Sequence, residues 1–393
     1  MTIRTMRAID RFAGVPLCWL SGALNALAAP KRAGSGNEVK TVLVVKFFGM
    51  GSVLLSTPVL STLLANRPRP RVLYLTFSTN RELLEKTSLP IEVVTISRQS
   101  FAGFAATAVS ALRRLRKEPI DVVLDLEFFS KFSTLVSVLS GARIRVGFDL
   151  PVRWRRSNLT HPVPIEHSCH VTRLFARQLE AIGMRATDDS GIARLSSSME
   201  EKASMESKLG LTDHGPEVIC LNINAGATSL ERRWRPNRFV EVARQLVRDD
   251  PSRRIFFIGN GSERRYVGEA LRQAGGEAAG FRNCSGELSV GELVALLERA
   301  SFLVTNDSGP MHLAAAVGTP VVALFGPESP VFYGPAGPSA VCYKSISCSP
   351  CLNVYNAKQT ACPYNTRCMA EITTNDVLDA IRSLPPNGGV RTP

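Results

Sequence analysis

One segment, Phe302–Gly326, limits the possible folds of this chain more than any other. An apolar strand runs into the polar turn Asn306–Gly309, and Pro310 follows at the first-turn position where a helix best tolerates proline. A short apolar helix is predicted over Met311–Val317, and Gly318 ends it before a second apolar strand begins. The pattern predicts a βαβ unit, whose polar turn and helix N-terminus lie at the carboxyl end of a strand, where α/β proteins bind ligands.

Short apolar strands alternate with helices through both halves of the sequence. In the first half the predicted strands are Val42–Val45, Arg71–Thr76, Ile91–Ile96, Ile120–Leu124 and Arg143–Gly147. In the second half they are Val218–Ile223, Arg254–Ile258, Phe302–Thr305 and Val321–Phe325. This alternation predicts an α/β protein with two doubly wound, Rossmann-like sheets. The expected divisions are an N-terminal helix and linker over 1–36, a first domain over 37–198, a second domain over 199–385 and a tail over 386–393.

The composition favours an anionic partner and a reducing compartment. The formal net charge is +13, and a basic surface attracts nucleic acid, acidic membranes or phosphorylated glycolipids, unless the charge serves only solubility. No nucleic-acid-binding motif is visible, and aromatic residues are not interleaved with the basic clusters, so nucleic acid is not an expected partner. The basic runs Arg143–Arg145 and Arg153–Arg156 are candidates for a surface that faces an anionic acceptor. Nine cysteines, mostly single within apolar segments, indicate reduced thiols in a cytosol.

The N-terminal segment, residues 1–36, combines basic residues with an apolar run. On a helix, one face would carry Arg7, Arg11, Gly14, Cys18, Ser21 and Asn25, and the other Phe12, Trp19, Leu20, Ala23, Leu24 and Leu27. This division favours a basic amphipathic helix that lies on a membrane surface, followed by a flexible linker. Two alternatives remain open: the helix docks onto the protein's own core, or it is a cleaved signal or a membrane-spanning helix.

Four segments in a fixed order resemble glycosyltransferase family 9, the ADP-heptose:lipopolysaccharide heptosyltransferases. Asp307–Pro320 resembles the family's Asp-Thr/Ser-Gly-x-x-His-Leu-Ala-Ala-Ala-x-Gly-x-Pro segment, and Val42–Leu60 its first strand, glycine-rich loop and helix. Ile219–Phe239 resembles the start of its second domain, and Cys348–Ile372 its cysteine-bearing tail. The resemblance implies a GT-B architecture, in which the two Rossmann-like domains face each other across a cleft. It also implies the inverting transfer of a sugar, heptose from ADP-heptose, to a lipopolysaccharide core or a similar lipid-linked glycan.

The donor site is expected in the second domain. The turn Asn224–Ser229 follows a strand, so its N–H groups and hydroxyls can cradle diphosphate oxygens. Arg232 stands where the family has a lysine, and an arginine can bind phosphate through two parallel N–H bonds. By resemblance, Glu263 is expected to contact the ribose of the nucleoside. The predicted donor-binding residues are Gly226, Thr228, Ser229, Arg232, Glu263, Asp307, Ser308, Gly309, Met311 and His312.

The predicted catalytic base departs from the family's pattern. The family's first glycine-rich loop ends Gly-Asp, and that Asp is its proposed general base, whereas this chain has Gly51-Ser52. A serine cannot accept the proton without a base of its own. We expect Glu127, at the carboxyl end of a neighbouring strand, to take over as catalytic base, with Ser52 assisting. Asp149 and a protein that binds its ligand without catalysis are the alternatives. Lys46, Gly51 and Ser52 are the predicted acceptor-binding residues.

No metal or cofactor is expected, because the sequence lacks the Asp-x-Asp with which metal-dependent glycosyltransferases hold a divalent ion. A structural zinc site at the tail cysteines Cys348, Cys351, Cys362 and Cys368 remains an alternative. The expected partners are the nucleotide-sugar donor, an anionic lipid-linked glycan and the inner-membrane surface. The expected location is therefore cytoplasmic, peripheral at the inner face of the inner membrane. The alternative functions are transfer of another sugar to another surface glycan, and non-catalytic binding of a nucleotide sugar or glycolipid.

Overall fold

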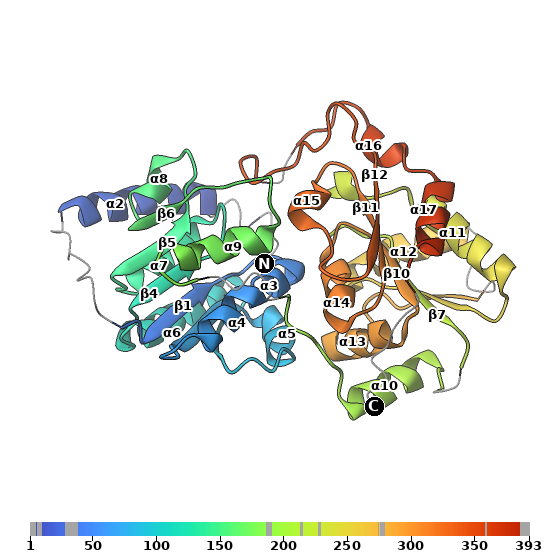
Figure 1. The fold of residues 1–393 in the computed structure, drawn as a ribbon, viewed down its shortest axis with the longest axis horizontal. Coiled ribbons are helices and arrows are strands. Elements are labelled where there is room, and N and C mark those ends of the chain that lie inside the picture. The colour runs from blue at the N-terminus through green and yellow to red at the C-terminus, as the bar shows by residue number, and fades with distance from the viewer. Residues whose placement is uncertain are drawn as a thin grey trace. The chain divides into compact units, whose positions relative to one another are not determined.

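The computed structural model describes residues 5, 10–27, 38–185, 191–212, 215–226, 229–273, 275, 280–357 and 360–385. The chain divides into two compact units, Met1–Ala193 and Arg194–Pro393, and each is built around its own parallel sheet (Figure 1). Among the predicted site residues, Thr228 lies outside the described residues.

The first unit contains a six-stranded sheet with the order β3-β2-β1-β4-β5-β6. Its strands are β1 (Thr41–Val45), β2 (Arg71–Phe77), β3 (Glu92–Ile96), β4 (Val122–Asp125), β5 (Ile144–Phe148) and β6 (His161–Val163), and every neighbouring pair is parallel. The helices are α2 (Gly14–Leu27), α3 (Met50–Leu55), α4 (Thr57–Ala65), α5 (Arg81–Glu85), α6 (Phe101–Lys117), α7 (Lys131–Leu139), α8 (Arg153–Arg156) and α9 (Val171–Glu180). All residues of β1 and β4 are buried, as expected of central strands covered on both faces.

The second unit contains a six-stranded sheet with the order β12-β11-β10-β7-β8-β9. Its strands are β7 (Val218–Asn222), β8 (Arg254–Phe257), β9 (Phe281–Asn283), β10 (Phe302–Asn306), β11 (Val321–Phe325) and β12 (Ser339–Tyr343), again all parallel. The helices are α10 (Met199–Leu209), α11 (Pro236–Asp249), α12 (Arg264–Gln273), α13 (Val290–Arg299), α14 (Gly309–Val317), α15 (Pro330–Tyr333), α16 (Arg367–Ala370) and α17 (Thr374–Arg382). Two short 3₁₀ helices, η2 (Leu230–Arg232) and η3 (Gly261–Glu263), follow β7 and β8.

Both sheets have the same winding order, and this order positions the site. In each unit the first strand lies in the middle of the sheet, beside the fourth strand of that unit: β1 pairs with β4, and β7 pairs with β10. The connections from these two neighbours leave in opposite directions, and such a switch point is where doubly wound sheets generally bind ligands. The prediction of two doubly wound parallel sheets is confirmed.

The predicted βαβ segment, Phe302–Gly326 in the second unit, folds as expected. Strand β10 leads into α14, with Pro310 in the first turn, and Gly318 ends the helix with φ of 86° in the left-handed region. Helices α3 and α4 in the first unit are separate, and the Ser56 hydroxyl between them donates to the carbonyl of Val53.

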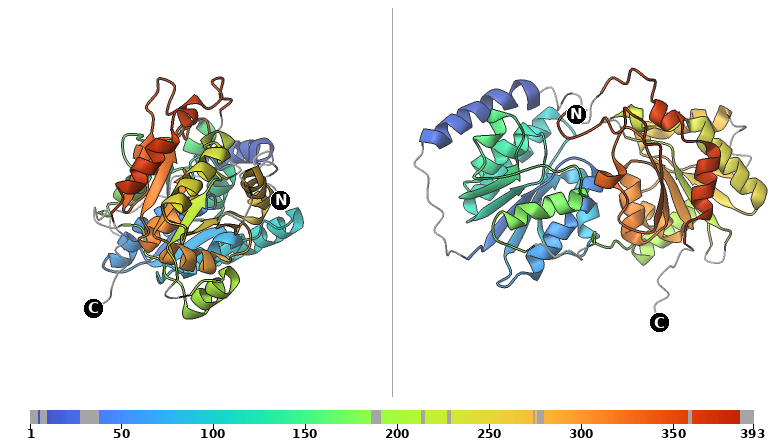
Figure 2. Two further views of the ribbon diagram at one scale, coloured as in Figure 1. Left: turned by 90° about the vertical axis from the view of Figure 1, so that its right-hand side faces the viewer. Right: turned by 45° about the horizontal axis from the view of Figure 1, so that its top comes forward.

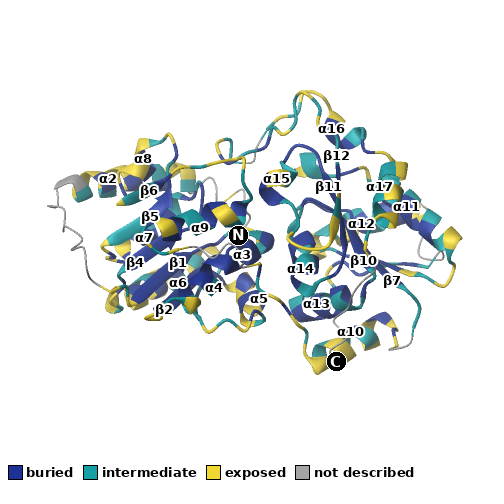
Figure 3. Cartoon of the chain, in the orientation of Figure 1, coloured by how far each residue is buried: buried dark blue, intermediate teal, exposed yellow. Residues whose placement is uncertain are grey.

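Helix α2 packs against α7 and α8 of the first unit (Figure 2). Figure 3 shows the central strands of both sheets buried, whereas α2 presents an exposed face. The N-terminal helix therefore docks onto the first unit, as one alternative held, while its contact with a membrane stays a prediction. Within the described part of the chain, no helix combines the length and the apolar character needed to cross a membrane.

Candidate functional site

In the first unit, a buried ion pair joins the residues that follow the carboxyl ends of β1 and β4. Lys46, directly after β1, donates from Nζ to Glu127 Oε1 over 2.9 Å, and the two residues are only 3% and 2% exposed. The same carboxylate oxygen accepts the N–H groups of Phe47 at 2.7 Å and Phe48 at 2.9 Å. Glu127 therefore holds the start of the glycine-rich loop against the end of β4.

A second buried ion pair supports the first. Asp125 and Arg155 are both fully buried, with Arg155 Nη2 3.2 Å from Asp125 Oδ2. Arg155 Nη2 also donates to the Glu127 carbonyl at 2.5 Å, and Ser133 Oγ donates to Asp125 Oδ2 at 3.0 Å. Burial raises the pKa of Asp125 to about 6, although Arg155 opposes the shift. Asp125 and Arg155 thus position the backbone that carries Glu127.

These contacts correct the prediction of a basic surface over Arg153–Arg156. Arg155 points into the first unit and is paired there, so its inclusion in that surface is wrong, whereas Arg153 and Arg156 are exposed. Asp149, the alternative base, accepts a hydrogen bond from Arg156 Nη1 at 2.8 Å.

The predicted acceptor residues Gly51 and Ser52 lie in the first turn of α3, just after the loop that Glu127 holds. Gly49, which precedes this helix, has φ of 83°, and a Cβ there would lie 3.3 Å from Ser52 Oγ. Gly51 is buried and Ser52 is half-buried. Lys46, Gly51 and Ser52 therefore follow β1 on the loop that Glu127 holds at the end of β4, and their roles stay predictions.

In the second unit, asparagine side chains link the ends of β7 and β10. Asn222 Nδ2 donates to Thr305 Oγ1 at 2.9 Å and to Ser308 Oγ at 2.7 Å. Asn306 Nδ2 donates to the Asn224 carbonyl at 3.2 Å. Ser308 turns its hydroxyl toward this network and does not cap α14 with its side chain. The N-terminus of α14, at Gly309, is thus arranged as an anion site without a capping side chain.

Arg232 is fixed beside this helix N-terminus. Its Nη1 donates to the carbonyl of Asp307 at 2.8 Å and to Asp307 Oδ2 at 3.1 Å, and its Nη2 donates to the Ala225 carbonyl at 2.6 Å. The Nε atom of Arg232 is buried and makes no hydrogen bond within the described residues. The structure therefore brings two predicted donor-site residues, Arg232 and Asp307, into contact and leaves an N–H group of the guanidinium available.

The remaining predicted donor residues differ in accessibility. Met311 and His312, on α14, are 0% and 4% exposed. Gly226 has φ of 67°, which favours glycine, and Ser229 Oγ is hydrogen-bonded to Glu231 Oε2 at 2.6 Å. The structure thus places all of these residues on the loops and helix that follow β7 and β10, and their contacts with a donor stay predictions.

Three polar groups crowd around Gly259, which follows β8. A Cβ at this position would lie 2.7 Å from Asn224 Nδ2, 2.9 Å from Ser285 Oγ and 3.2 Å from Glu263 Oε2. Asn224 Oδ1 and Ser285 Oγ are buried and lack hydrogen-bond partners among the described residues. Burial raises the pKa of Glu263, an effect moderated by the Asn260 N–H and by Arg233. A ligand that carries hydroxyl groups would satisfy these buried atoms.

Sequence reasoning did not identify Asn222, Asn306, Asp125 or Arg155 as parts of these networks. The signal that could have found three of them is their position at the carboxyl end of a central strand, in a residue type that rarely ends a strand without a partner. Arg155 carries no comparable signal, because its neighbours Arg153 and Arg156 are exposed.

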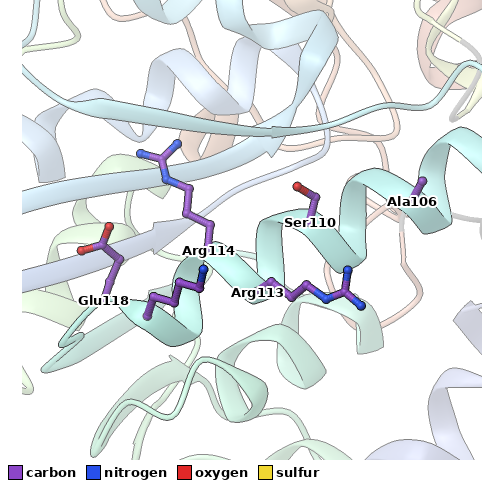
Figure 4. Close-up of a pocket in the computed structure, with 6 residues that line it drawn as sticks. Ala106, Ser110, Arg113, Arg114 and Glu118 are labelled. Atoms are coloured by element: carbon purple, nitrogen blue, oxygen red, sulfur yellow. The ribbon is translucent and has the colours of Figure 1, made fainter.

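A hollow on the outer face of α6 contains none of the predicted site residues (Figure 4). It is lined by Ala106, Ser110, Arg113, Arg114, Lys117 and Glu118. Arg114 is paired with Glu92 at 3.0 Å and Glu118 with Arg71 at 2.5 Å, so both charges are engaged within the unit.

Among the described residues, no group of three or more His, Cys, Asp or Glu side chains is arranged to hold a metal ion. The nine cysteines are all free thiols.

Comparisons with known proteins show the family of this chain. The family model described as glycosyltransferase family 9 (heptosyltransferase) matches residues 109–361. Lipopolysaccharide heptosyltransferase 3 of Escherichia coli K12 is 28% identical over 294 residues, which cover 72% of this chain and 82% of that protein. Lipopolysaccharide heptosyltransferase 2 of Salmonella typhimurium is 30% identical over 192 residues, and this match spans 48% of the chain and about half, 53%, of the relative.

Solved structures support the same fold. A family 9 glycosyltransferase from Veillonella parvula has a TM-score of 0.71 at 24% identity, covering 88% of this chain and 97% of that one. The Escherichia coli ADP-heptose lipopolysaccharide heptosyltransferase II has a TM-score of 0.68 at 23% identity, covering 87% and 97%. These likenesses confirm the predicted GT-B fold. Because the family model spans well over half of the sequence, the chain belongs to glycosyltransferase family 9, the heptosyltransferase family.

Proposed function

We propose that the chain is an inverting, metal-independent glycosyltransferase that moves heptose from ADP-heptose to a lipopolysaccharide core glycan or a similar lipid-linked acceptor. Membership of the heptosyltransferase family and the names of its relatives support this reaction class. The observation that carries the donor assignment is Arg232, which Asp307 and Ala225 hold beside the N-terminus of α14 with a buried N–H group still available. The reaction would take place at the inner face of the inner membrane, where a lipid-linked acceptor is anchored.

In this proposal the second unit binds the donor. The Arg232 guanidinium and the backbone N–H groups at the start of α14 stabilise the negative charge that grows on the diphosphate as it leaves. The polar groups around Gly259, with Glu263 among them, bind the hydroxyl groups of the nucleoside. A cationic side chain and a helix N-terminus together supply the positive potential for which other glycosyltransferases use a divalent ion.

The first unit binds the acceptor and supplies the base. A hydroxyl oxygen of the acceptor forms a new bond to the anomeric carbon, while the bond from that carbon to the diphosphate oxygen breaks and ADP leaves with the electron pair. The hydroxyl proton passes to the Glu127 carboxylate, and attack opposite the leaving group inverts the anomeric configuration. Lys46 and the N–H groups of Phe47 and Phe48 hold Glu127 Oε1, so the proton would be taken by Oε2.

One observation favours a second candidate function. Glu127 already accepts three hydrogen bonds through one oxygen, and Ser52 stands in place of the family's aspartate. Both features suit a carboxylate whose task is to hold a loop in a protein that binds a nucleotide sugar without transferring the sugar.

Release of ADP separates the two functions. The purified chain is mixed with ADP-heptose and a lipopolysaccharide acceptor truncated before its heptose, and ADP and the mass of the product are followed with time. Transfer predicts acceptor-dependent ADP release and a product heavier by one heptose, with inverted configuration by NMR. Binding of ADP-heptose by calorimetry, without ADP release in the presence of acceptor, would instead establish the binding protein.

A further inference from the structure

Helix α2 is rich in apolar residues, and it turns its small and polar side chains toward the protein. Ser21 Oγ donates to Asn158 Oδ1 at 2.7 Å, and Asn25 Nδ2 reaches the same oxygen at 3.2 Å. Asn158 Nδ2 donates in return to the carbonyl of Cys18 at 2.9 Å. A Cβ on Gly14 would lie 2.6 Å from Lys131 Cβ, so the helix backbone approaches α7 more closely than a larger side chain would permit.

The segment before α2 strengthens this docking. Asp10 accepts the N–H groups of Lys131 at 3.2 Å and Phe132 at 2.8 Å, and so caps the N-terminus of α7. The ammonium group of Lys131 lies 3.6 Å from Asp10 Oδ2 and 5.1 Å from the ring centre of Trp154. Helix α2 is therefore held in one orientation by specific polar contacts.

The opposite face of the helix is apolar and faces outward. Phe12 is 78% exposed, Leu17 50%, Trp19 49%, and Leu20 and Leu24 59% each. No other helix or strand in the described part of the chain exposes more than two large apolar side chains. A contiguous exposed apolar patch on a soluble fold marks a surface that another molecule covers.

Basic residues accompany this apolar face. Arg11 precedes α2, and Arg153 and Arg156 lie exposed on α8, the helix against which α2 packs. The whole chain carries a net charge of +13. Arg156 is also paired with Asp149 at 2.8 Å. Exposed apolar side chains on one helix, with exposed arginines before it and on a helix that it packs against, match the interface of an anionic bilayer, where apolar groups enter the acyl boundary and cations meet the phosphates.

We infer that α2, docked on α7 and α8, binds the surface of an anionic phospholipid bilayer through Leu17, Trp19, Leu20 and Leu24, together with Phe12 just before the helix. This inference rests on the proposed function in naming a membrane as partner, and it adds the element and the face that make the contact. The small-residue face fixes the helix on the protein, so binding places the first unit at a set orientation to the membrane.

The chain contains its own reporter for this contact. Of its three tryptophans, Trp154 is 9% exposed and Trp234 is fully buried, whereas Trp19 is 49% exposed and lies on the apolar face. Vesicles of 30% phosphatidylglycerol and 70% phosphatidylethanolamine should shift the tryptophan emission to shorter wavelength, and brominated lipid should quench it. High salt and vesicles of phosphatidylcholine alone should weaken the binding.

The decisive comparison uses two double variants of the full chain. Leu20→Ser/Leu24→Ser should weaken vesicle binding by about a hundredfold, since burial of each large apolar side chain contributes roughly tenfold. Phe101→Ser/Val109→Ser removes two exposed apolar side chains from α6 of the same unit, 64% and 44% exposed, and should leave vesicle binding unchanged. Equal binding by wild type and Leu20→Ser/Leu24→Ser would overturn the inference, and so would a wild type that ignores the vesicles.

Two further measurements separate this inference from its competitors. A wild type that forms dimers which Leu20→Ser/Leu24→Ser abolishes, with no vesicle binding, would show that a second copy covers the face. Turnover of a lipid-free acceptor should be the same in wild type and Leu20→Ser/Leu24→Ser, while turnover of a vesicle-embedded acceptor should fall in the variant. Absence of any turnover would reject the proposed function, while vesicle binding would still test the membrane contact.

Discussion

At the scale of single residues, Arg232 is the most informative position. Replacement with alanine removes the bonds to Asp307 and Ala225 together with any bond to phosphate. A charged hydrogen bond contributes about 1.5–3 kcal/mol, so we expect Arg232→Ala to weaken ADP binding about tenfold or more by calorimetry. Arg232→Lys should lose part of this affinity, because an ammonium group cannot make two parallel bonds.

Arg248→Ala is the matched control, because Arg248 lies on α11 with its side chain 58% exposed. Its ADP affinity and circular dichroism spectrum should match those of the wild type. Wild-type ADP affinity in Arg232→Ala would remove this residue from the donor site.

Glu127 tests the proposed base. Glu127→Gln should lower turnover by roughly 10²–10⁴, the usual contribution of a general base, and leave ADP affinity nearly unchanged. Ser52→Ala should have a much milder effect. Because Glu127 also holds the loop, the discriminating variant is Glu127→Gln/Ser52→Asp, which restores a carboxylate at the family's position and should recover part of the turnover. Near-normal turnover in Glu127→Gln would reject the assignment.

The sequence could indicate residues that belong to local patterns, such as Asp307 in its polar turn and Arg232, two residues before Trp234. It could not indicate pairs joined only by the fold: Asp125 meets Arg155 across 30 positions, and Asn222 meets Ser308 across 86. Each of these side chains satisfies a buried partner whose position depends on the order of the strands, which a local pattern does not encode.

At the scale of elements, Glu292 connects two helices of the second unit. On α13, it accepts hydrogen bonds from Ser204 at 2.6 Å and Lys208 at 2.8 Å, both on α10. Burial would raise the pKa of Glu292, but these hydrogen bonds outweigh it and lower the pKa to about 2. A carboxylate with a depressed pKa stabilises the fold above its ordinary pKa, and this contribution is lost as pH falls toward the folded-state value.

Glu292→Gln should therefore destabilise the protein by roughly 1–2 kcal/mol at pH 7, by chemical denaturation. The difference in the free energy of unfolding between this variant and the wild type should become smaller as pH falls below about 4.5, the ordinary pKa of glutamate. Glu269→Gln is the control, because its partner Arg265 is 90% exposed and such pairs contribute little. If the stability difference between Glu292→Gln and the wild type did not change with pH, the lowered pKa of Glu292 would be contradicted.

Docking of α2 has a test of its own, independent of lipid. Cys18 lies on the inward face, and burial raises the pKa of its thiol to about 12, so iodoacetamide should not label it in the wild type. A Cβ on Gly22 would overlap the hydroxyl oxygen of Ser157, so Gly22→Leu should lift the helix and expose Cys18. Labelling is read by mass spectrometry against the half-buried Cys362. Labelling of Cys18 in the wild type would show that the helix is not docked.

The elements that sequence patterns predicted are the central ones. The long apolar strands and the helix α14 appear where expected, because their burial on both faces demands apolar residues. The strands β6, β9 and β12 were missed. They are edge strands or short: β6 and β9 have three residues each, and β12 alternates in burial, so none carries a long apolar run.

At the scale of the whole molecule, the two units contain sheets with the same strand order but have different proposed roles. The first unit is proposed to bind the acceptor and the second to bind the donor. The sequence could indicate both sheets and, through its resemblance to a family, the GT-B fold class. It could not indicate that the N-terminal helix belongs to the first unit, because the contacts that hold it lie on α7 and α8, more than a hundred residues later.

The proposed donor site predicts that sugar transfer needs no added metal ion. Positive charge from Arg232 and from the N-terminus of α14 replaces the divalent ion, so excess EDTA should leave the rate of ADP release unchanged. Loss of activity in EDTA, followed by recovery with Mg²⁺ or Mn²⁺, would contradict the metal-independent mechanism.

The cap that Asp10 places on α7 has a consequence for synthesis. Lys131 follows Asp10 by 121 residues, and Asn158 follows Cys18 by 140. Ribosomes add roughly 5–20 residues per second, so α2 leaves the ribosome on the order of ten seconds before its docking partners exist. During that interval both faces of the helix are uncovered. The apolar residues of α2 are therefore synthesised well before the parts of the first unit on which the helix docks, and this unit folds against a segment that is already made.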